Sequence, residues 1–185
     1  MKYTLLFIFI TLTNNAFACS CGGWSENRVE AVKNAYHGSD NIVIAKVISI
    51  NKLSPIELHE YKKRGFKRET TYFKKITSFK GDMPDKFTTT MDVGGGMCGE
   101  SFIQGETYLL YLRSSMYENN SYATSICDLN DTLDGAEDDV NIIENLGVNL
   151  NNSINIYWLE LANRYKEGNG VKKDTDKYNQ LYNLK

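Results

Sequence analysis

Short runs of apolar and β-branched residues, separated by polar turns, fill the middle of the chain. Residues 41–50 (NIVIAKVISI) form a nearly continuous β-branched run of strand length. Four further runs have a similar composition, at residues 70–80, 86–93, 107–113 and 121–127. Strands of this length with glycine-containing turns between them are typical of a small antiparallel barrel or sandwich. The pattern therefore predicts a mainly β fold.

Helical spacing appears on both sides of these strands. Residues 25–37 have apolar positions three and four apart behind Ser25, which we expect to be the N-cap. Residues 131–146 show the same spacing between a capping Asp131 and a terminating Gly147. The apolar face of this second helix is formed by Leu133, Ala136, Val140, Ile143 and Leu146.

Two segments remain to be assigned, one between the first two strands and one at the C-terminus. Residues 51–68 are lysine-rich around Pro55, which predicts a long loop with at most a helical turn. At the C-terminus, residues 154–165 are amphipathic, and Asp174 can cap a second helix that continues to Tyr182. We expect an αα-hairpin to follow the β domain.

The first residues have the pattern of a secretory signal peptide. Lys2 precedes an apolar stretch at residues 3–12, and Ala16-Phe17-Ala18 is a small-x-small cleavage site. Residues 1–18 are therefore predicted to be removed, which leaves Cys19 at the mature N-terminus. No later run is long and apolar enough for a transmembrane segment. We expect a secreted or periplasmic protein.

Four cysteines follow the leader, at positions 19, 21, 98 and 127. An even number of cysteines in an exported chain predicts two disulfides. A Cys19–Cys21 bond is disfavoured by disulfide geometry, so each of these residues is expected to pair with either Cys98 or Cys127. A zinc site made of the four cysteines is the rival interpretation, and the C-x-C spacing and the export signal both argue against it.

Charge and motifs exclude several classes of function. The formal net charge of −2 argues against a nucleic-acid partner. The basic residues of segment 62–68 are interpreted as a solvated surface. His37 and His59 have no carboxylate or second histidine at a useful spacing, and we expect both on the surface. We therefore predict that the protein is not an enzyme and needs no cofactor.

The new N-terminus itself carries usable chemistry. A free α-amine has a pKa near 8, so part of the population is neutral and able to bind a metal. The amine and the carbonyl of Cys19 together form a chelating pair. Catalytic zinc in metalloproteases keeps one position open, which such a pair can occupy. Ser20 would then point into the specificity pocket of the protease.

Several short stretches occur in the order and spacing of one known family. They are Cys19-Ser20-Cys21, residues 39–47 (SDNIVIAKV), residues 78–81 (SFKG), Cys98-Gly99 with Phe102, Gly105 with residues 108–110 (YLL), and Thr124 before Cys127. Together they resemble the netrin-like domain of the tissue inhibitors of metalloproteinases (TIMPs) and their bacterial relatives.

This resemblance implies an OB-like five-stranded β-barrel with flanking helices. It also implies the bridges Cys19–Cys98 and Cys21–Cys127. In the family, the N-terminal cysteine chelates the zinc of the target protease and the next residue enters its specificity pocket. Those residues would here be Cys19 and Ser20, and the protein would hold no metal of its own.

The tail has a resemblance of its own. The pattern of residues 161–177 (LANRYKEGNGVKKDTDK) is similar to one unit of the Sel-one-like repeat, a relative of the tetratricopeptide repeat. The expected organisation is therefore a signal peptide at 1–18, a TIMP-like OB-fold domain at 19–148 and a helical repeat unit at 149–185.

Two functions remain as hypotheses. One is an exported inhibitor of zinc metalloendopeptidases, acting through Cys19 and Ser20. The alternative is a non-inhibitory netrin-like binding or scaffold module of the cell envelope, because a fold does not fix a function. A lipid anchor on Cys19 is a third interpretation, disfavoured because Ala16-Phe17-Ala18 fits ordinary signal peptidase better.

Overall fold

A computed structural model of the protein describes residues 19, 21, 25–51, 53–94, 96–115, 121–146 and 151–183. The expected signal peptide at 1–18, Ser20 and the expected helix stop at Gly147 lie outside these residues. Among the described residues, no helix has the length and apolar character needed to cross a membrane.

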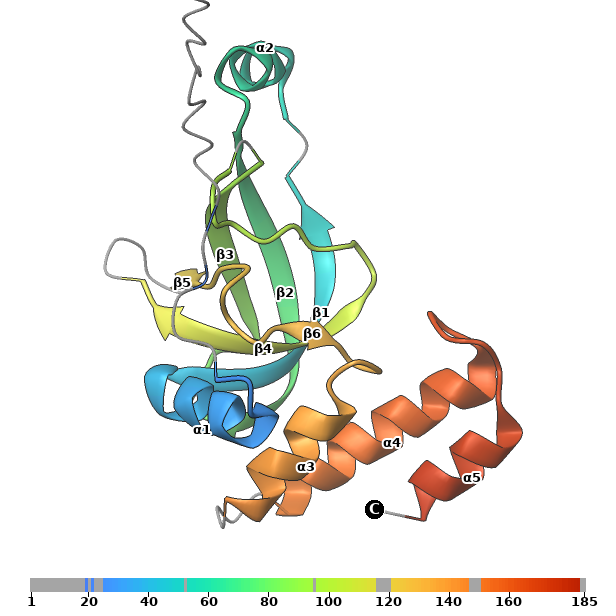
Figure 1. The fold of residues 1–185 in the computed structure, drawn as a ribbon. Coiled ribbons are helices and arrows are strands. Elements are labelled where there is room, and N and C mark those ends of the chain that lie inside the picture. The colour runs from blue at the N-terminus through green and yellow to red at the C-terminus, as the bar shows by residue number, and fades with distance from the viewer. Residues whose placement is uncertain are drawn as a thin grey trace, which may run out of the picture.

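Five strands close into a barrel, and a sixth short strand extends it (Figure 1). The six strands are β1 (Asn41–Ile50), β2 (Lys67–Lys80), β3 (Lys86–Val93), β4 (Thr107–Ser114), β5 (Ser121–Ala123) and β6 (Asp131–Thr132). Their order is β1-β2-β3-β5-β4, and a further pairing of β1 with β4 closes the ring. The prediction of an OB-like five-stranded barrel is confirmed.

The β3–β5 pairing differs from the others. It is parallel, and it joins Thr88 to Ser121 and Thr89 to Tyr122. The pairings of β1 with β2 and β4, and of β2 with β3, are antiparallel and much longer. The barrel is therefore closed along one side by a short parallel contact, which we call the β3–β5 seam.

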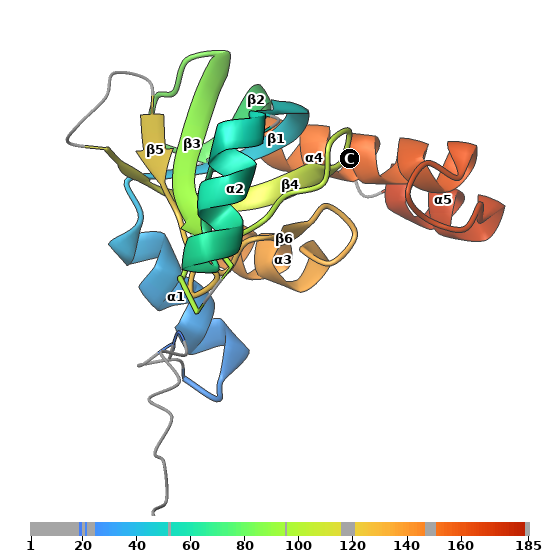
Figure 2. The ribbon, with the colours of Figure 1, turned by 90° about the horizontal axis from the view of Figure 1, so that it is seen from above.

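Helices lie at both ends of the barrel (Figures 1 and 2). They are α1 (Arg28–Gly38), α2 (Pro55–Arg64), α3 (Glu137–Asn145), α4 (Asn151–Glu167) and α5 (Thr175–Tyr182). Helix α2 stands at one end, in the connection between β1 and β2, and α1 and α3 lie at the other end with α4 and α5 (Figure 1).

The barrel interior is filled by one side of each strand. In β3 the alternation is strict, because Phe87, Met91 and Val93 are buried and the residues between the inward positions are more exposed. Phe73 stacks on Phe87 with ring centroids 5.1 Å apart. The interior cluster consists of Val43, Ala45, Val47, Phe73, Met83, Phe87, Met91, Val93, Phe102, Tyr108, Leu110 and Leu112.

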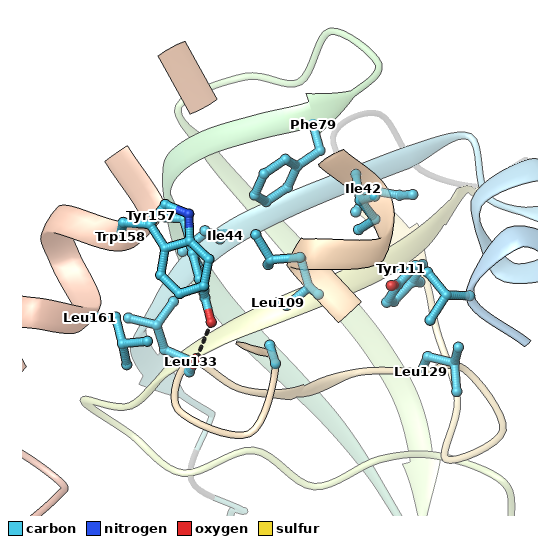
Figure 3. Close-up of a cluster of buried hydrophobic side chains, with 14 of the residues drawn as sticks. Ile42, Ile44, Phe79, Leu109, Tyr111, Leu129, Leu133, Tyr157, Trp158 and Leu161 are labelled. Atoms are coloured by element: carbon cyan, nitrogen blue, oxygen red, sulfur yellow. Dashed lines mark hydrogen bonds between the residues drawn. The ribbon is translucent and has the colours of Figure 1, made fainter. Parts of the chain in front are cut away.

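A second cluster lies between the outer surface of the barrel and the helices (Figure 3). The barrel contributes Ile42 and Ile44 of β1 and Leu109 of β4. Helix α4 contributes Tyr157, Trp158 and Leu161, and α5 contributes Leu181. The Tyr157 hydroxyl donates to the carbonyl of Leu133 at 3.2 Å. Strands β1 and β4 are therefore buried on both faces, which explains why their sequences are almost continuously apolar.

One helix prediction was wrong at its beginning, and one segment predicted to be a loop is a helix. Asn27 caps α1, accepting from the amides of Val29 and Glu30, whereas Ser25 accepts from the amide of Asn27. Residues 55–64 form a helix where a loop was expected. Its first turn is fixed by a capping box, in which Ser54 accepts from the Glu57 amide and the Glu57 carboxylate accepts from the Ser54 amide.

The predicted helix from Asp131 was also wrong in its first turn. Asp131 and Thr132 instead pair with Leu109 and Tyr108 of β4, and the helix begins at Glu137. The predicted fifth strand likewise ends early, at Ala123. The residues that follow turn away because Thr124 donates to the Tyr111 carbonyl instead of continuing the ladder.

The tail helices agree closely with their predicted positions. Asp174 caps α5 by accepting from the Lys177 amide at 2.9 Å, as expected. Arg164 of α4 is buried and pairs with Glu106, next to β4, at 2.9 Å. The assignment of the tail to a Sel-one-like unit and the division at residue 148 stay predictions.

Candidate functional site: the disulfide ridge

Two disulfides attach the N-terminal segment to the barrel. They join Cys19 to Cys98 and Cys21 to Cys127, which is the pairing that the TIMP resemblance implies. All four sulfur atoms are used. A zinc site built from these cysteines is therefore ruled out in this state, because metal binding needs thiolates.

The two disulfides bring three segments of the chain together. Cys98 lies in the β3–β4 loop and Cys127 lies in the β5–β6 loop. The amide of Ile126 donates to the carbonyl of Cys98 at 2.9 Å, and the sulfurs of Cys19 and Cys127 are 3.8 Å apart. We call the surface formed by Cys19, Cys21, Met97–Gly99 and Ser125–Cys127 the disulfide ridge.

Close backbone packing holds the β3–β4 loop beneath the ridge. The amide of Gly99 donates to the Asp92 carbonyl at 3.2 Å. A Cβ atom at position 99 would lie 2.2 Å from that carbonyl oxygen, so only glycine fits. Upstream, the amide of Met97 donates to the carbonyl of Gly94, which has a left-handed φ of 84°. These contacts fix the position of Cys98.

Asn130 joins the two loops that carry the disulfides. Its side-chain amide donates to the Glu100 carboxyl at 2.5 Å and to the Thr124 hydroxyl at 2.6 Å. Its side-chain oxygen accepts from the Tyr111 amide at 2.8 Å. Glu100 follows Cys98 by two residues, and Thr124 precedes Cys127 by three. The Asn130 side chain thus couples both disulfide positions to strand β4.

The carboxyl of Glu100 has a raised pKa. Burial raises the pKa of Glu100 to about 7, and the negative charges of Asp128 and Asp131 add to the increase. The hydrogen bond from Asn130 acts in the opposite direction and is outweighed. Asp128 itself is held by a bidentate pair with Arg113, at 2.8 and 2.9 Å. The charge beneath the ridge therefore changes near neutral pH.

Exposed apolar side chains flank the disulfides. Met97, next to Cys98, is 40% exposed, and Ile126, next to Cys127, is 48% exposed. Both project from loops whose backbone is fixed by hydrogen bonds. A rigid backbone with protruding apolar groups is suited to binding another protein, since little ordering is needed on contact.

The other candidate residues lie away from the ridge or outside the described chain. Ser20, expected at its centre, is outside the described residues. His37 and His59 are exposed, as predicted. The basic segment 62–68 is largely exposed, and Arg64 and Arg68 form ion pairs with Glu60 and Asp92. In the part of the chain that the structure describes, no group of histidines, cysteines and carboxylates is arranged to hold a metal.

Sequence reasoning missed Glu100 and Asn130. Neither lies in a recognisable motif, and they meet only because two loops separated by the whole of β4 and β5 fold together. The comparisons add no family to this picture, because neither the family models nor the curated proteins compared with the chain gave a match.

Proposed function

We propose that the exported protein is a TIMP-like inhibitor of zinc metalloendopeptidases that acts through Cys19. The observation that carries the proposal is the pair of disulfides at Cys19 and Cys21, which hold this segment against two separate loops. A segment bonded at two positions two residues apart loses little conformational entropy when it binds.

The proposed chemistry starts with removal of the leader after Ala18. The freed α-amine and the carbonyl of Cys19 chelate the target's zinc and displace its water. Ser20 enters the adjacent specificity pocket. The inhibitor performs no reaction and holds no metal of its own, because the zinc belongs to the protease.

The surroundings of Cys19 suit this role. Met97 and Ile126 supply exposed apolar side chains next to the cysteines that bond Cys19 and Cys21. The disulfides are typical of oxidising compartments and fit an extracytoplasmic location, where secreted or periplasmic proteases are met. In this proposal the tail is a Sel-one-like unit that packs on the barrel away from the contact.

One added residue tests the mechanism. We expect mature protein beginning at Cys19 to inhibit at least one zinc protease of a panel, and a variant with one alanine before Cys19 to lose inhibition. The extension moves the α-amine away from the zinc while both disulfides stay intact. A variant with one alanine after Lys185 is the matched control and should inhibit like the mature protein.

Mass spectrometry and the protease panel together distinguish the alternatives. Mass spectrometry of the first peptide establishes whether Cys19 is free or acylated, and acylation would exclude chelation by the amine. Full inhibition by the extended variant would contradict the proposed mechanism. If free-terminus protein inhibits no protease of the panel, the non-inhibitory netrin-like scaffold is the better description.

A further inference from the structure

Strand register places three lysines side by side on the outer surface of the barrel. Lys46 of β1 is paired with Lys74 of β2, and Lys74 is paired with Lys86 of β3. All three side chains are exposed, because their neighbours Val47, Phe73 and Phe87 point into the barrel. Adjacent strands are about 5 Å apart, so the three residues form a continuous row, which we call the lysine row.

Nothing within the described chain neutralises this row. None of the three ammonium groups forms an ion pair or hydrogen bond with another described residue. Asp85, the carboxylate next to Lys86 in sequence, pairs instead with Lys75 at 3.7 Å. Like charges directly opposite each other on neighbouring strands destabilise a sheet. The lysine row therefore destabilises the sheet locally, and no ion pair among the described residues compensates for this repulsion.

A hollow of about 360 Å³ adjoins the lysine row. It is lined by Ile48, Ser49, Tyr72, Lys86, Phe87 and Thr88, among others. Tyr72 is 39% exposed and Ile48 44% exposed, so the hollow has an aromatic and an aliphatic wall beside a cationic edge. None of the residues that line this hollow belongs to the second cluster, which packs against helices α1, α3, α4 and α5.

We propose that the lysine row and the adjoining hollow together bind an acidic polysaccharide. The lysine row holds successive carboxylate or sulfate groups, and the hollow holds one sugar ring against Tyr72. This inference is independent of the proposed protease inhibition, because it uses none of the ridge residues.

Two other polyanions fit the site less well. A single-stranded nucleic acid is normally held by several aromatic side chains on which successive bases stack. Among the described residues of β1, β2 and β3, Tyr72 is the one exposed aromatic. An anionic membrane is met by protruding apolar groups that enter the lipid, whereas Tyr72 and Ile48 line a depression.

The test is a binding titration of the mature protein with polygalacturonate, a polymer of uronic acid, at low salt. We expect Lys46→Gln/Lys74→Gln/Lys86→Gln to weaken binding by about tenfold or more, because it removes the charged contacts. Lys33→Gln/Lys62→Gln/Lys63→Gln changes the net charge equally at exposed positions elsewhere and should bind within about twofold of wild type. Tyr72→Ala should weaken binding without changing the dependence on salt.

Folding and selectivity complete the test. Removing opposed like charges should leave the thermal midpoint of the lysine-row variant at or above that of wild type. Equal loss of binding in both triple variants would overturn the proposal, since charge alone would then explain it. Tighter binding to single-stranded DNA of matched charge, or binding to anionic phospholipid vesicles but not to polygalacturonate, would also overturn it.

Discussion

At the scale of single residues, burial brings the pKa of the Glu100 carboxyl into the neutral range. Its carboxyl lies between the β3–β4 loop and Asn130, within the field of Asp128 and Asp131. Neutral Glu100 suits this site better than charged Glu100, because ionisation adds a third negative charge to a partly buried region. The protonation state of one side chain therefore affects the loops that carry both disulfides.

Glu100→Gln should remove part of the pH dependence of stability. The pKa of Glu100 is about 7 in the folded protein, against an ordinary value of 4.5. Between these values the folded state keeps a proton that the unfolded state has released. The free energy of unfolding therefore falls as pH rises from 5 to 7, at most by about 1.4 kcal/mol per pH unit. Urea unfolding at several pH values should show a flatter slope for Glu100→Gln.

The matched control is Glu144→Gln, on the exposed side of α3. This variant should keep the slope of wild type. An equally steep slope for Glu100→Gln and wild type would show that another group carries the pH dependence.

Which residues were predictable depends on how local their role is. Cys19 and Cys21 were identified from sequence because the cleavage site and the C-x-C spacing are contiguous. The Glu100–Asn130 contact and the lysine row were not identified. The first depends on how two loops meet, and the second depends on strand register across β1, β2 and β3, neither of which a single sequence specifies.

At the scale of elements, the difference between local and long-range signals explains why helix α2 and strand β6 were not predicted. The sequence Ser54-Pro55-Ile56-Glu57 contains the complete capping box of α2, so a signal was present. It was outweighed because α2 has no buried residue and hence no apolar face to detect. By contrast, the sequence of the two residues of β6 has no pattern typical of a strand. They are a strand only because they pair with Tyr108 and Leu109 of β4.

Arg28→Ala should weaken the packing of α1 on α3. Arg28 pairs with Asp139 at 2.7 Å, and Asp139 is completely buried and also accepts from the Tyr111 hydroxyl. Removing Arg28 leaves a buried carboxyl without its charged partner, and burial already raises the pKa of Asp139. We expect a loss of about 2 kcal/mol in the free energy of unfolding, because Arg28 is half-exposed and its site is partly solvated.

Arg68→Ala provides the comparison for this measurement. Arg68 pairs with Asp92 on the surface, and its removal should cost about 0.5 kcal/mol or less in chemical denaturation. Similar losses in the two variants would contradict a special role for the Arg28–Asp139 pair.

At the scale of the whole molecule, two apolar clusters share strands β1 and β4. One face of these strands closes the barrel interior, and the other receives α1, α3, α4 and α5 (Figure 3). The apolar runs at residues 41–50 and 107–113 predicted β1 and β4 correctly as strands. The sequence did not reveal that the tail helices would complete the cover of those strands, because the contact of β1 with α4 joins segments about 110 residues apart.

Cys21→Ser/Cys127→Ser should destabilise the molecule strongly. This bond closes a loop with a sequence separation of 106 residues. In the chain-entropy picture its loss costs about 4 kcal/mol in the free energy of unfolding. Guanidinium denaturation measures this cost, and Ser101→Ala, at an exposed position that leaves both disulfides intact, is the reference variant. A cost below about 1 kcal/mol would mean that the bond orders the ridge without stabilising the fold.

The two disulfides also link the loops that follow the strands of the β3–β5 seam, which bears on how the protein matures. Cys98 follows β3, Cys127 follows β5, and their partners Cys19 and Cys21 are two residues apart. The N-terminal peptide is thus a covalent bridge across the parallel pairing of β3 with β5, which has two paired positions. Its closure is an oxidation, so it belongs to the compartment in which thiols are oxidised. Until both disulfides have formed, the covalent bridge between the loops that follow β3 and β5 is incomplete.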